Sequence, residues 1–169
     1  RLELTALGRE RAIEVVRKHR LAERLLTDVI GLDWAHTHEE ACRWEHVMSD
    51  QVEQRLGEIL HNPTTDPYGN PIPGTDGVSD GISMELALRM GESTSGTVTR
   101  IGEPIQAETE VLDAFARCGV RPGARINFEA DPREVVLEVT HTNDGKESVP
   151  GQAVQLPLTL APHLFITLN

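Results

Sequence analysis

A turn-rich segment divides this chain of 169 residues into two parts of different character. Residues 62–81 hold four prolines and four glycines, so 8 of 20 positions disfavour both helix interiors and central strands. Apolar residues recur at helical spacing before this segment, and short β-like runs separated by turn residues follow it. The sequence therefore predicts an α+β multidomain chain, with a helical domain at 1–75, a linker at 76–95 and a small β domain at 96–169.

Two long helices are predicted in the first part. A helix covers residues 5–30 and ends at Gly31, a residue that commonly terminates helices. A second helix is predicted over 38–60, because Thr37 and Glu40 have the spacing of a capping box. Two such helices form a hairpin that buries little apolar surface alone, so the pattern predicts packing against a third layer or against a second copy of the chain.

The second part has the pattern of a compact, mainly β domain. Residues 82–90 are compatible with a short helix or an extended tether, and their periodicity does not decide between the two. The phenylalanines of this part, Phe115, Phe128 and Phe165, are its candidate core aromatics. The predicted elements are strands at 96–101, 124–130, 133–140 and 164–168, with a helix at 108–120.

Charge and composition restrict the possible partners. The 27 acidic side chains exceed the 16 basic ones, and the net charge of -11 makes direct DNA binding by this chain unfavourable, since phosphate contacts need lysine and arginine. No apolar run approaches the ~20 residues that span a bilayer, so we expect a cytoplasmic protein without a membrane partner. The two cysteines lack CxxC spacing, and no disulfide framework is expected.

Potential metal ligands are concentrated in the helical part. His19 and Glu23 are four residues apart, as are Cys42 and His46, so each pair lies on one helix face and can hold one ion. Nitrogen, sulfur and oxygen donors together suit a transition metal rather than Ca²⁺ or Mg²⁺. A solvated ion pair and a small buried cysteine explain the same residues without a metal. The candidate ligands are His19, Glu23, His38, Cys42, Glu45 and His46.

Four motifs in the chain resemble those of one known family. The motifs are HRLAERLL at 19–26, HEEACRWEHVMSD at 38–50, GNPIPG at 69–74 and, more weakly, IGEPIQ at 101–106. They are similar to those of the diphtheria toxin repressor family of iron-dependent transcriptional regulators. The resemblance implies a winged-helix DNA-binding domain, then a helical dimerisation and metal-binding domain, then an SH3-like β-barrel. This chain resembles the family from the end of the wing onward, so the DNA-binding domain is expected to lie outside it.

The same resemblance implies three binding sites. A primary metal site also uses a methionine from the missing domain, and an ancillary metal site joins the helical and β domains. An anion site lies beside the ancillary metal, where this chain has Asp66 at a position that is often serine in the family. The implied residues are Cys42, Glu45 and His46 at the primary site, His19, Glu23, His38, Glu103 and Gln106 at the ancillary site, and Arg20 and Asn70 at the anion site.

The family resemblance implies a homodimeric repressor that binds operator DNA, through its N-terminal domain, when loaded with Fe²⁺. We expect Co²⁺, Ni²⁺, Zn²⁺ or Mn²⁺ to substitute in vitro, and the thiol of Cys42 favours iron over manganese. Three alternatives remain: a manganese-responsive regulator of the same family, a non-haem iron enzyme built on His19, Glu23 and His38, and a peptide-binding role for the β domain. No cosubstrate motif is evident, so we expect no enzymatic activity.

Overall fold

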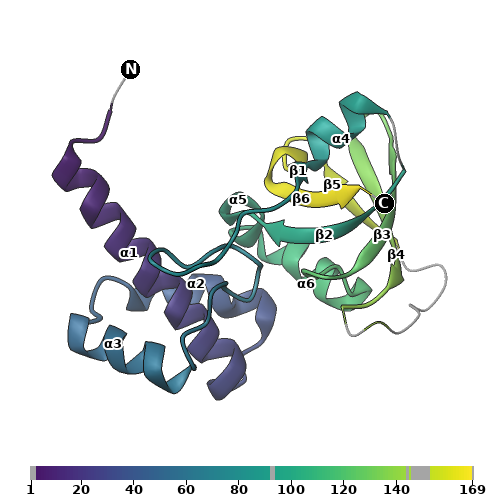
Figure 1. The fold of residues 1–169 in the computed structure, drawn as a ribbon. Helices are drawn as coiled ribbons and strands as arrows, with labels where there is room; N and C mark the ends of the chain where they lie inside the picture. Colours follow the sequence, from purple (N-terminus) through teal and green to yellow (C-terminus); the bar gives the residue numbers. More distant parts are fainter. Residues whose placement is uncertain (1–2, 92–93, 144, 146–152, 169) are drawn as a thin grey trace. The chain divides into compact units, whose positions relative to one another are not determined.

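The computed structural model describes residues 3–91, 94–143, 145 and 153–168. The chain divides into two compact units, Arg1–Val78 and Ser79–Asn169. The first unit is helical and the second is built around a β-sheet (Figure 1). Among the described helices, none has the length and apolar character that a membrane span requires.

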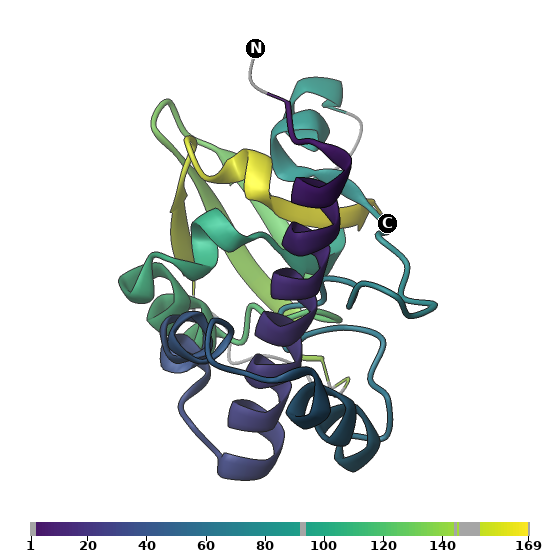
Figure 2. The same cartoon turned by 90° about the vertical axis from the view of Figure 1, so that its left-hand side faces the viewer.

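The long first helix confirms the prediction for residues 5–30. α1, Ala6–Arg24, begins at Thr5, whose hydroxyl accepts a hydrogen bond from the backbone N–H of Gly8, and Figure 2 shows α1 along its length in purple. A π-helical turn, Leu25–Ile30, extends it to Gly31. Gly31 has a φ of 74°, a left-handed conformation that glycine adopts at little cost, and the helix ends there as predicted.

The predicted continuous helix over 38–60 is wrong. The structure has two helices here, α2 at Trp34–Trp44 and α3 at Asp50–Ile59. Asp33 caps α2 by accepting from the N–H of Ala35, whereas the hydroxyl of Thr37, the predicted cap, donates to the carbonyl of Asp33. The side chain of Ser49 caps α3. Asp33 and Ser49 therefore cap the N-termini of the two helices, in place of the predicted capping box of Thr37 and Glu40.

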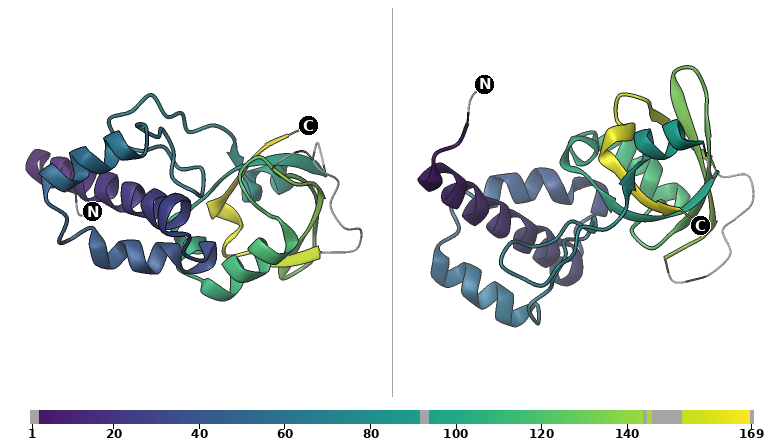
Figure 3. Two further views of the ribbon diagram at one scale, coloured as in Figure 1. Left: turned by 90° about the horizontal axis from the view of Figure 1, so that it is seen from below. Right: turned by 45° about the horizontal axis from the view of Figure 1, so that its top comes forward.

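The turn-rich segment packs against the helices of its own unit. Tyr68 and Ile72 are fully buried, and the hydroxyl of Tyr68 donates to the carbonyl of Trp34 at 2.7 Å. In Figure 3 the segment runs alongside α1. Three arginines on α1 donate to its carbonyl oxygens: Arg17 to Pro73, Arg20 to Pro71, and Arg24 to Thr65. Residues 64–73 are thus held on α1 by charge-assisted hydrogen bonds rather than serving as a free linker.

The second unit contains a six-stranded antiparallel sheet in the order β1-β6-β2-β3-β4-β5. Its strands alternate between buried and exposed residues, so one face forms the core. The helices of this unit lie beside the sheet (Figure 1). The elements are β1 Ile82–Ser83, α4 Met84–Met90, β2 Ser95–Ile101, α5 Glu103–Gln106, α6 Thr109–Cys118, β3 Arg125–Ala130, β4 Glu134–His141, β5 Ala153–Pro157, a 3-10 turn Ala161–His163 and β6 Leu164–Leu168.

The four predicted strands and the predicted helix of this unit are confirmed, and Gly119 ends α6 in a left-handed conformation. Two strands were not predicted, β1 and β5. The open question about residues 82–90 resolves as β1 followed by α4, so these elements lie inside the range 76–95 predicted as a linker. Phe115 and Phe128 are buried in the core, and the guanidinium of Arg100 lies over the ring of Phe165.

Candidate metal centre

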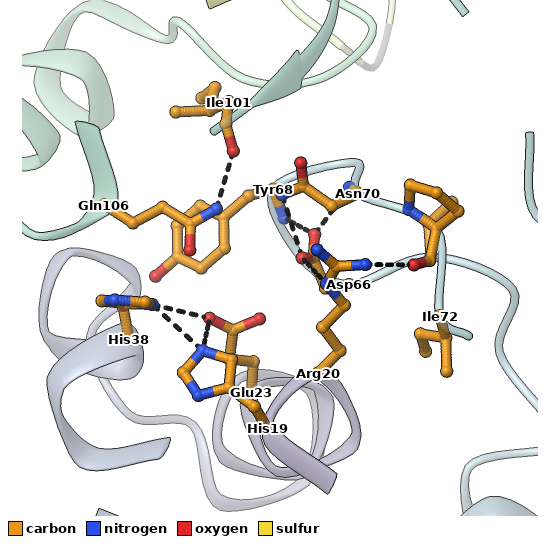
Figure 4. Close-up of polar contacts among 12 residues, drawn as sticks. His19, Arg20, Glu23, His38, Asp66, Tyr68, Asn70, Ile72, Ile101 and Gln106 are labelled. Atoms are coloured by element: carbon orange, nitrogen blue, oxygen red, sulfur yellow. Dashed lines mark hydrogen bonds and ion pairs between the residues drawn. The ribbon is translucent and has the colours of Figure 1, made fainter. Parts of the chain in front are cut away.

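Three of the predicted ancillary ligands meet between α1 and α2. The Nε2 atom of His19 lies 2.7 Å from Oε1 of Glu23 and 3.1 Å from Nδ1 of His38. The same carboxylate oxygen lies 3.1 Å from Nδ1 of His38 (Figure 4). One atom from each side chain therefore points to a common centre, as ligands of a single ion do.

Small residues bring the two helices close enough for this contact. Ala22 on α1 and Ala41 on α2 are completely buried and form one cluster with Leu26. His19 and His38 each precede one of these alanines by three residues, so each histidine lies on the same face of its helix as the alanine. The close packing of α1 on α2 thus determines the separation of the two imidazoles.

The buried histidine and glutamate side chains of this centre shift each other's pKa values. Burial alone would lower the pKa of His19, but hydrogen bonds to Glu23 and Glu45 and the charges of these carboxylates outweigh it and raise the pKa. Burial would raise the pKa of Glu23, yet its hydrogen bonds to His19 and His38 lower it. A proton on His19 therefore balances the charge of the buried carboxylate here, a role that a divalent cation can take over.

An unpaired oxygen shows that the donor set fits a metal ion. Glu23 is completely buried, and its Oε2 atom has no hydrogen-bond partner among the residues that the structure describes. A buried carboxylate oxygen without a partner is costly, and coordination to a cation would remove that cost. Two imidazoles and a carboxylate are typical ligands of Zn²⁺, Fe²⁺ and neighbouring ions.

The predicted primary ligands lie beside this centre and are linked to it. Sγ of Cys42 is 3.8 Å from Nε2 of His38, and Oε2 of Glu45 is 2.7 Å from Nδ1 of His19. The other oxygen of Glu45 lies 3.1 Å from Nε2 of His46, whose side chain is mostly exposed. A carboxylate on the second nitrogen of a histidine orients the ring and increases its basicity toward a metal, so Glu45 connects the two predicted ligand sets.

Glu103 and Gln106 lie on α5 in the second unit. The side-chain amide of Gln106 donates to the carbonyl of Ile101 at 2.6 Å, while its Oε1 atom is buried without a hydrogen-bond partner among the described residues. Glu103 is the first residue of α5. Their participation in the ancillary site remains a prediction.

The residues predicted to hold an anion contact a carboxylate of the chain itself. The side-chain amide of Asn70 donates to Oδ2 of Asp66 at 3.0 Å, and Nε of Arg20 lies 3.5 Å from the same oxygen (Figure 4). Burial and the negative charge of Glu23 raise the pKa of Asp66 to about 7, although Asn70 and Arg20 act against this. In the sequence, the aspartate at an often-serine position was the only sign of this arrangement.

Comparison with known proteins finds relatives of one kind. Residues 5–74 match the family model described as the iron dependent repressor, metal binding and dimerisation domain. The iron-dependent repressor IdeR of Mycobacterium leprae is 49% identical over 145 residues, and the match covers 80% of this chain and 63% of that protein. The diphtheria toxin repressor of Corynebacterium jeikeium is 42% identical, with 92% of this chain and 73% of that protein covered.

Solved structures agree with these matches. A manganese-dependent transcriptional repressor in complex with manganese superposes with a TM-score of 0.78 at 29% identity, covering 99% of this chain and 75% of that one. IdeR of T. acidophilum gives a TM-score of 0.69 at 27% identity, covering 99% and 72%. This chain spans less than two thirds of the length of the Mycobacterium leprae relative. The matched proteins are repressors, which confirms the prediction that this chain is not an enzyme.

Proposed function

Because the chain belongs to the family of iron-dependent repressors that includes the diphtheria toxin repressor, we propose that it is the metal-sensing and dimerising portion of a repressor activated by Fe²⁺. Operator DNA would be bound through an N-terminal domain that this sequence does not include. The observation that carries the proposal is the convergence of His19 and His38 on Oε1 of Glu23, whose other oxygen, Oε2, is buried without a hydrogen-bond partner among the described residues. A bound cation would supply the positive charge that this centre otherwise takes from protons.

Two ligand sets would each bind one metal ion. His19, Glu23 and His38 would hold the ancillary ion, completed by Glu103 and Gln106 from the β unit. The primary set is Cys42, Glu45 and His46, with a further ligand from outside this chain. The thiol favours iron, whereas Co²⁺, Ni²⁺, Zn²⁺ or Mn²⁺ would substitute in vitro. A manganese-responsive regulator is the alternative, supported by the manganese-dependent repressor among the structural relatives.

The proposed domains follow the family order. We propose a helical dimerisation and metal-binding domain over 1–75 and an SH3-like barrel over 96–169, joined by the segment 76–95. Within this segment, β1 and α4 belong to the second unit. The antiparallel sheet of the second unit supports the barrel, since a short, strongly paired sheet of this kind can curl upon itself.

Dimerisation would use an apolar groove of the helical unit. The valine Val47 is 82% exposed in the turn between α2 and α3, and Val52 on α3 is half exposed. Exposed apolar side chains at helical spacing that line a groove are typical of protein interfaces. The groove is lined by Leu25, Trp44, Val47, Met48, Ser49, Val52 and Leu56. A second copy of this chain covering it would form the homodimer.

Anaerobic calorimetry of Co²⁺ binding tests the proposal. We expect His19→Ala to lose the tighter binding event and Cys42→Ala to lose a separate, weaker one. His61→Asn is the matched control, because it removes an exposed imidazole of the same unit at a φ of 58°, which asparagine tolerates. Absence of Co²⁺ binding in the unsubstituted chain, or equal binding by His19→Ala and the control, would contradict the proposed sensor.

A further inference from the structure

We propose that Asp66 is a built-in anion of the metal centre. Its carboxylate takes the place beside Arg20 and Asn70 that the family resemblance assigns to a free anion, so that metal binding by this chain does not depend on sulfate or phosphate. The inference rests on the proposed metal-sensing function and adds to it a residue that tunes the site without touching the ion.

Both oxygens of Asp66 are engaged by donors that would suit a tetrahedral anion. Oδ1 accepts from the backbone N–H groups of Tyr68 at 2.8 Å and Asn70 at 2.9 Å. Oδ2 accepts from the side-chain amide of Asn70 at 3.0 Å and pairs with the guanidinium of Arg20 at 3.5 Å. Two backbone donors, one amide and one guanidinium are the mixture that binds oxyanions in proteins.

The Asp66 carboxylate and its donor Asn70 are buried, which favours the carboxylate over a free anion from solution. Asp66 is 2% exposed and Asn70 is 3% exposed. Arg20 is further fixed by donating to the carbonyl of Pro71, so its guanidinium points into the loop that carries Asp66. A free anion would have to displace the carboxylate from these donors and would bring a second negative charge into a buried place. Like charges in such surroundings repel strongly, so exclusion of the free anion follows from the geometry.

Asp66 is also coupled to the proposed ligands. Arg20 directly follows His19 on α1 and precedes Glu23 by three residues, so the guanidinium belongs to the same helical turn as both. Burial, and after it the negative charge of Glu23, raise the pKa of Asp66, so the charge of Glu23 disfavours ionisation of Asp66. A divalent cation on Glu23 would counter this effect and favour ionised Asp66. The carboxylate would thus add negative potential around the ion, as an anion beside the metal does.

A purely structural role is the competing explanation, since Asp66 also closes a tight turn by accepting from Tyr68 and Asn70. Dependence on an added anion separates the two roles, because a turn residue has no reason to make metal binding sensitive to sulfate. Asp66→Ser removes the carboxylate from the donors of Arg20 and Asn70, so that sulfate can bind in its place. Asp66→Asn keeps an acceptor for the turn and removes only the charge. Asp76→Ser, an exposed position in the same segment, is the matched control.

The experiment is Co²⁺ calorimetry on the full chain, in chloride buffer with and without millimolar sulfate. We expect the unsubstituted chain and Asp76→Ser to be insensitive to sulfate. Asp66→Ser is expected to bind Co²⁺ about tenfold more weakly and to recover most of this loss with sulfate. Asp66→Asn is expected to lose affinity by a similar factor without recovery, because its amide still fills the place of the anion.

Three results would overturn the inference. The first is a sulfate-dependent affinity in the unsubstituted chain, and the second is unchanged affinity in both variants at Asp66. The third is a loss in Asp66→Ser that sulfate does not restore while Asp66→Asn binds normally, which would show that only the turn matters. If Co²⁺ binding depends on His19 but not on Asp66, the metal sensor stands and only this inference falls. If no Co²⁺ binds to the unsubstituted chain, both fall.

Discussion

The buried carboxylate of Asp66 is expected to make the stability of the metal-free chain depend on pH. Its pKa is raised from 3.8 to about 7 by burial and by the charge of Glu23. Between these two values the folded chain binds a proton that the unfolded chain has released, so the free energy of unfolding falls as pH rises. At about 1.4 kcal/mol per pKa unit, the ~3-unit shift corresponds to a loss of about 4 kcal/mol between pH 4 and pH 7.

Asp66→Asn removes this titration and leaves the other ionisable groups in place. His19 and Glu23 also titrate with shifted pKa values, but they are present in both proteins, so the difference between the two stability profiles reports Asp66 together with its interaction with Glu23. The unsubstituted chain is expected to lose its stability relative to Asp66→Asn progressively from pH 4 to pH 7. Above pH 7.5 the difference is expected to be constant.

Urea unfolding in the presence of EDTA, at four pH values between 4.5 and 7.5, measures the effect. Both tryptophans, Trp34 and Trp44, lie in the helical unit, so fluorescence reports the unit that contains Asp66. Trp34 also packs on Tyr68, with ring centroids 4.8 Å apart, and therefore senses release of the loop. Asp76→Asn serves as the exposed control. A difference between the chain and Asp66→Asn that stays flat over this range would refute the reasoning.

Three further predictions follow from contacts of the helical unit. Glu45→Gln removes a carboxylate that raises the pKa of His19, so this pKa is expected to fall, as followed by NMR titration of the imidazole in the metal-free chain. Val47→Asp places a charge in the apolar groove and is expected to weaken dimerisation about tenfold or more, as measured by sedimentation equilibrium. An intact dimer of this variant would place the interface elsewhere. Ala41→Leu overfills the contact between α1 and α2 and is expected to lower the free energy of unfolding in urea by about 1–3 kcal/mol and to weaken Co²⁺ binding. Unchanged Co²⁺ affinity would show that the packing of the two helices does not set the geometry of the site.

The sequence predicted best what depends on a single helix. The spacing of His19 and Glu23 fixes them on one face of α1, so their contact needs no knowledge of the rest of the fold. The continuous helix over 38–60 was a wrong prediction because the chain around Val47 turns between two helices instead of continuing one. In the structure this valine is 82% exposed in the turn between two helices. An apolar residue that serves a partner surface looks the same in sequence as one that serves the core.

The missed strands have a different cause. β1 has two residues and β5 ends at Pro157, so neither carries a strong strand pattern of its own. β1 forms only by pairing with β6, and β5 only by pairing with β4. Such elements depend on strands distant in the chain, and local propensity gives little indication of them.

The contacts of Asp66 show how the tertiary structure can change the meaning of a recognised motif. Arg20 and Asn70 carry the same donors whatever residue lies at position 66, so motif matching predicts a free anion for both. The bonds from Arg20 to Pro71 and from Tyr68 to Trp34 bring the loop onto α1 and α2 and place the Asp66 carboxylate on those donors. Once it is there, donors that would attract an anion from solution already have one. The residue at position 66 therefore changes the partner of these donors, and the packing of the loop shows that this partner is a carboxylate of the chain itself.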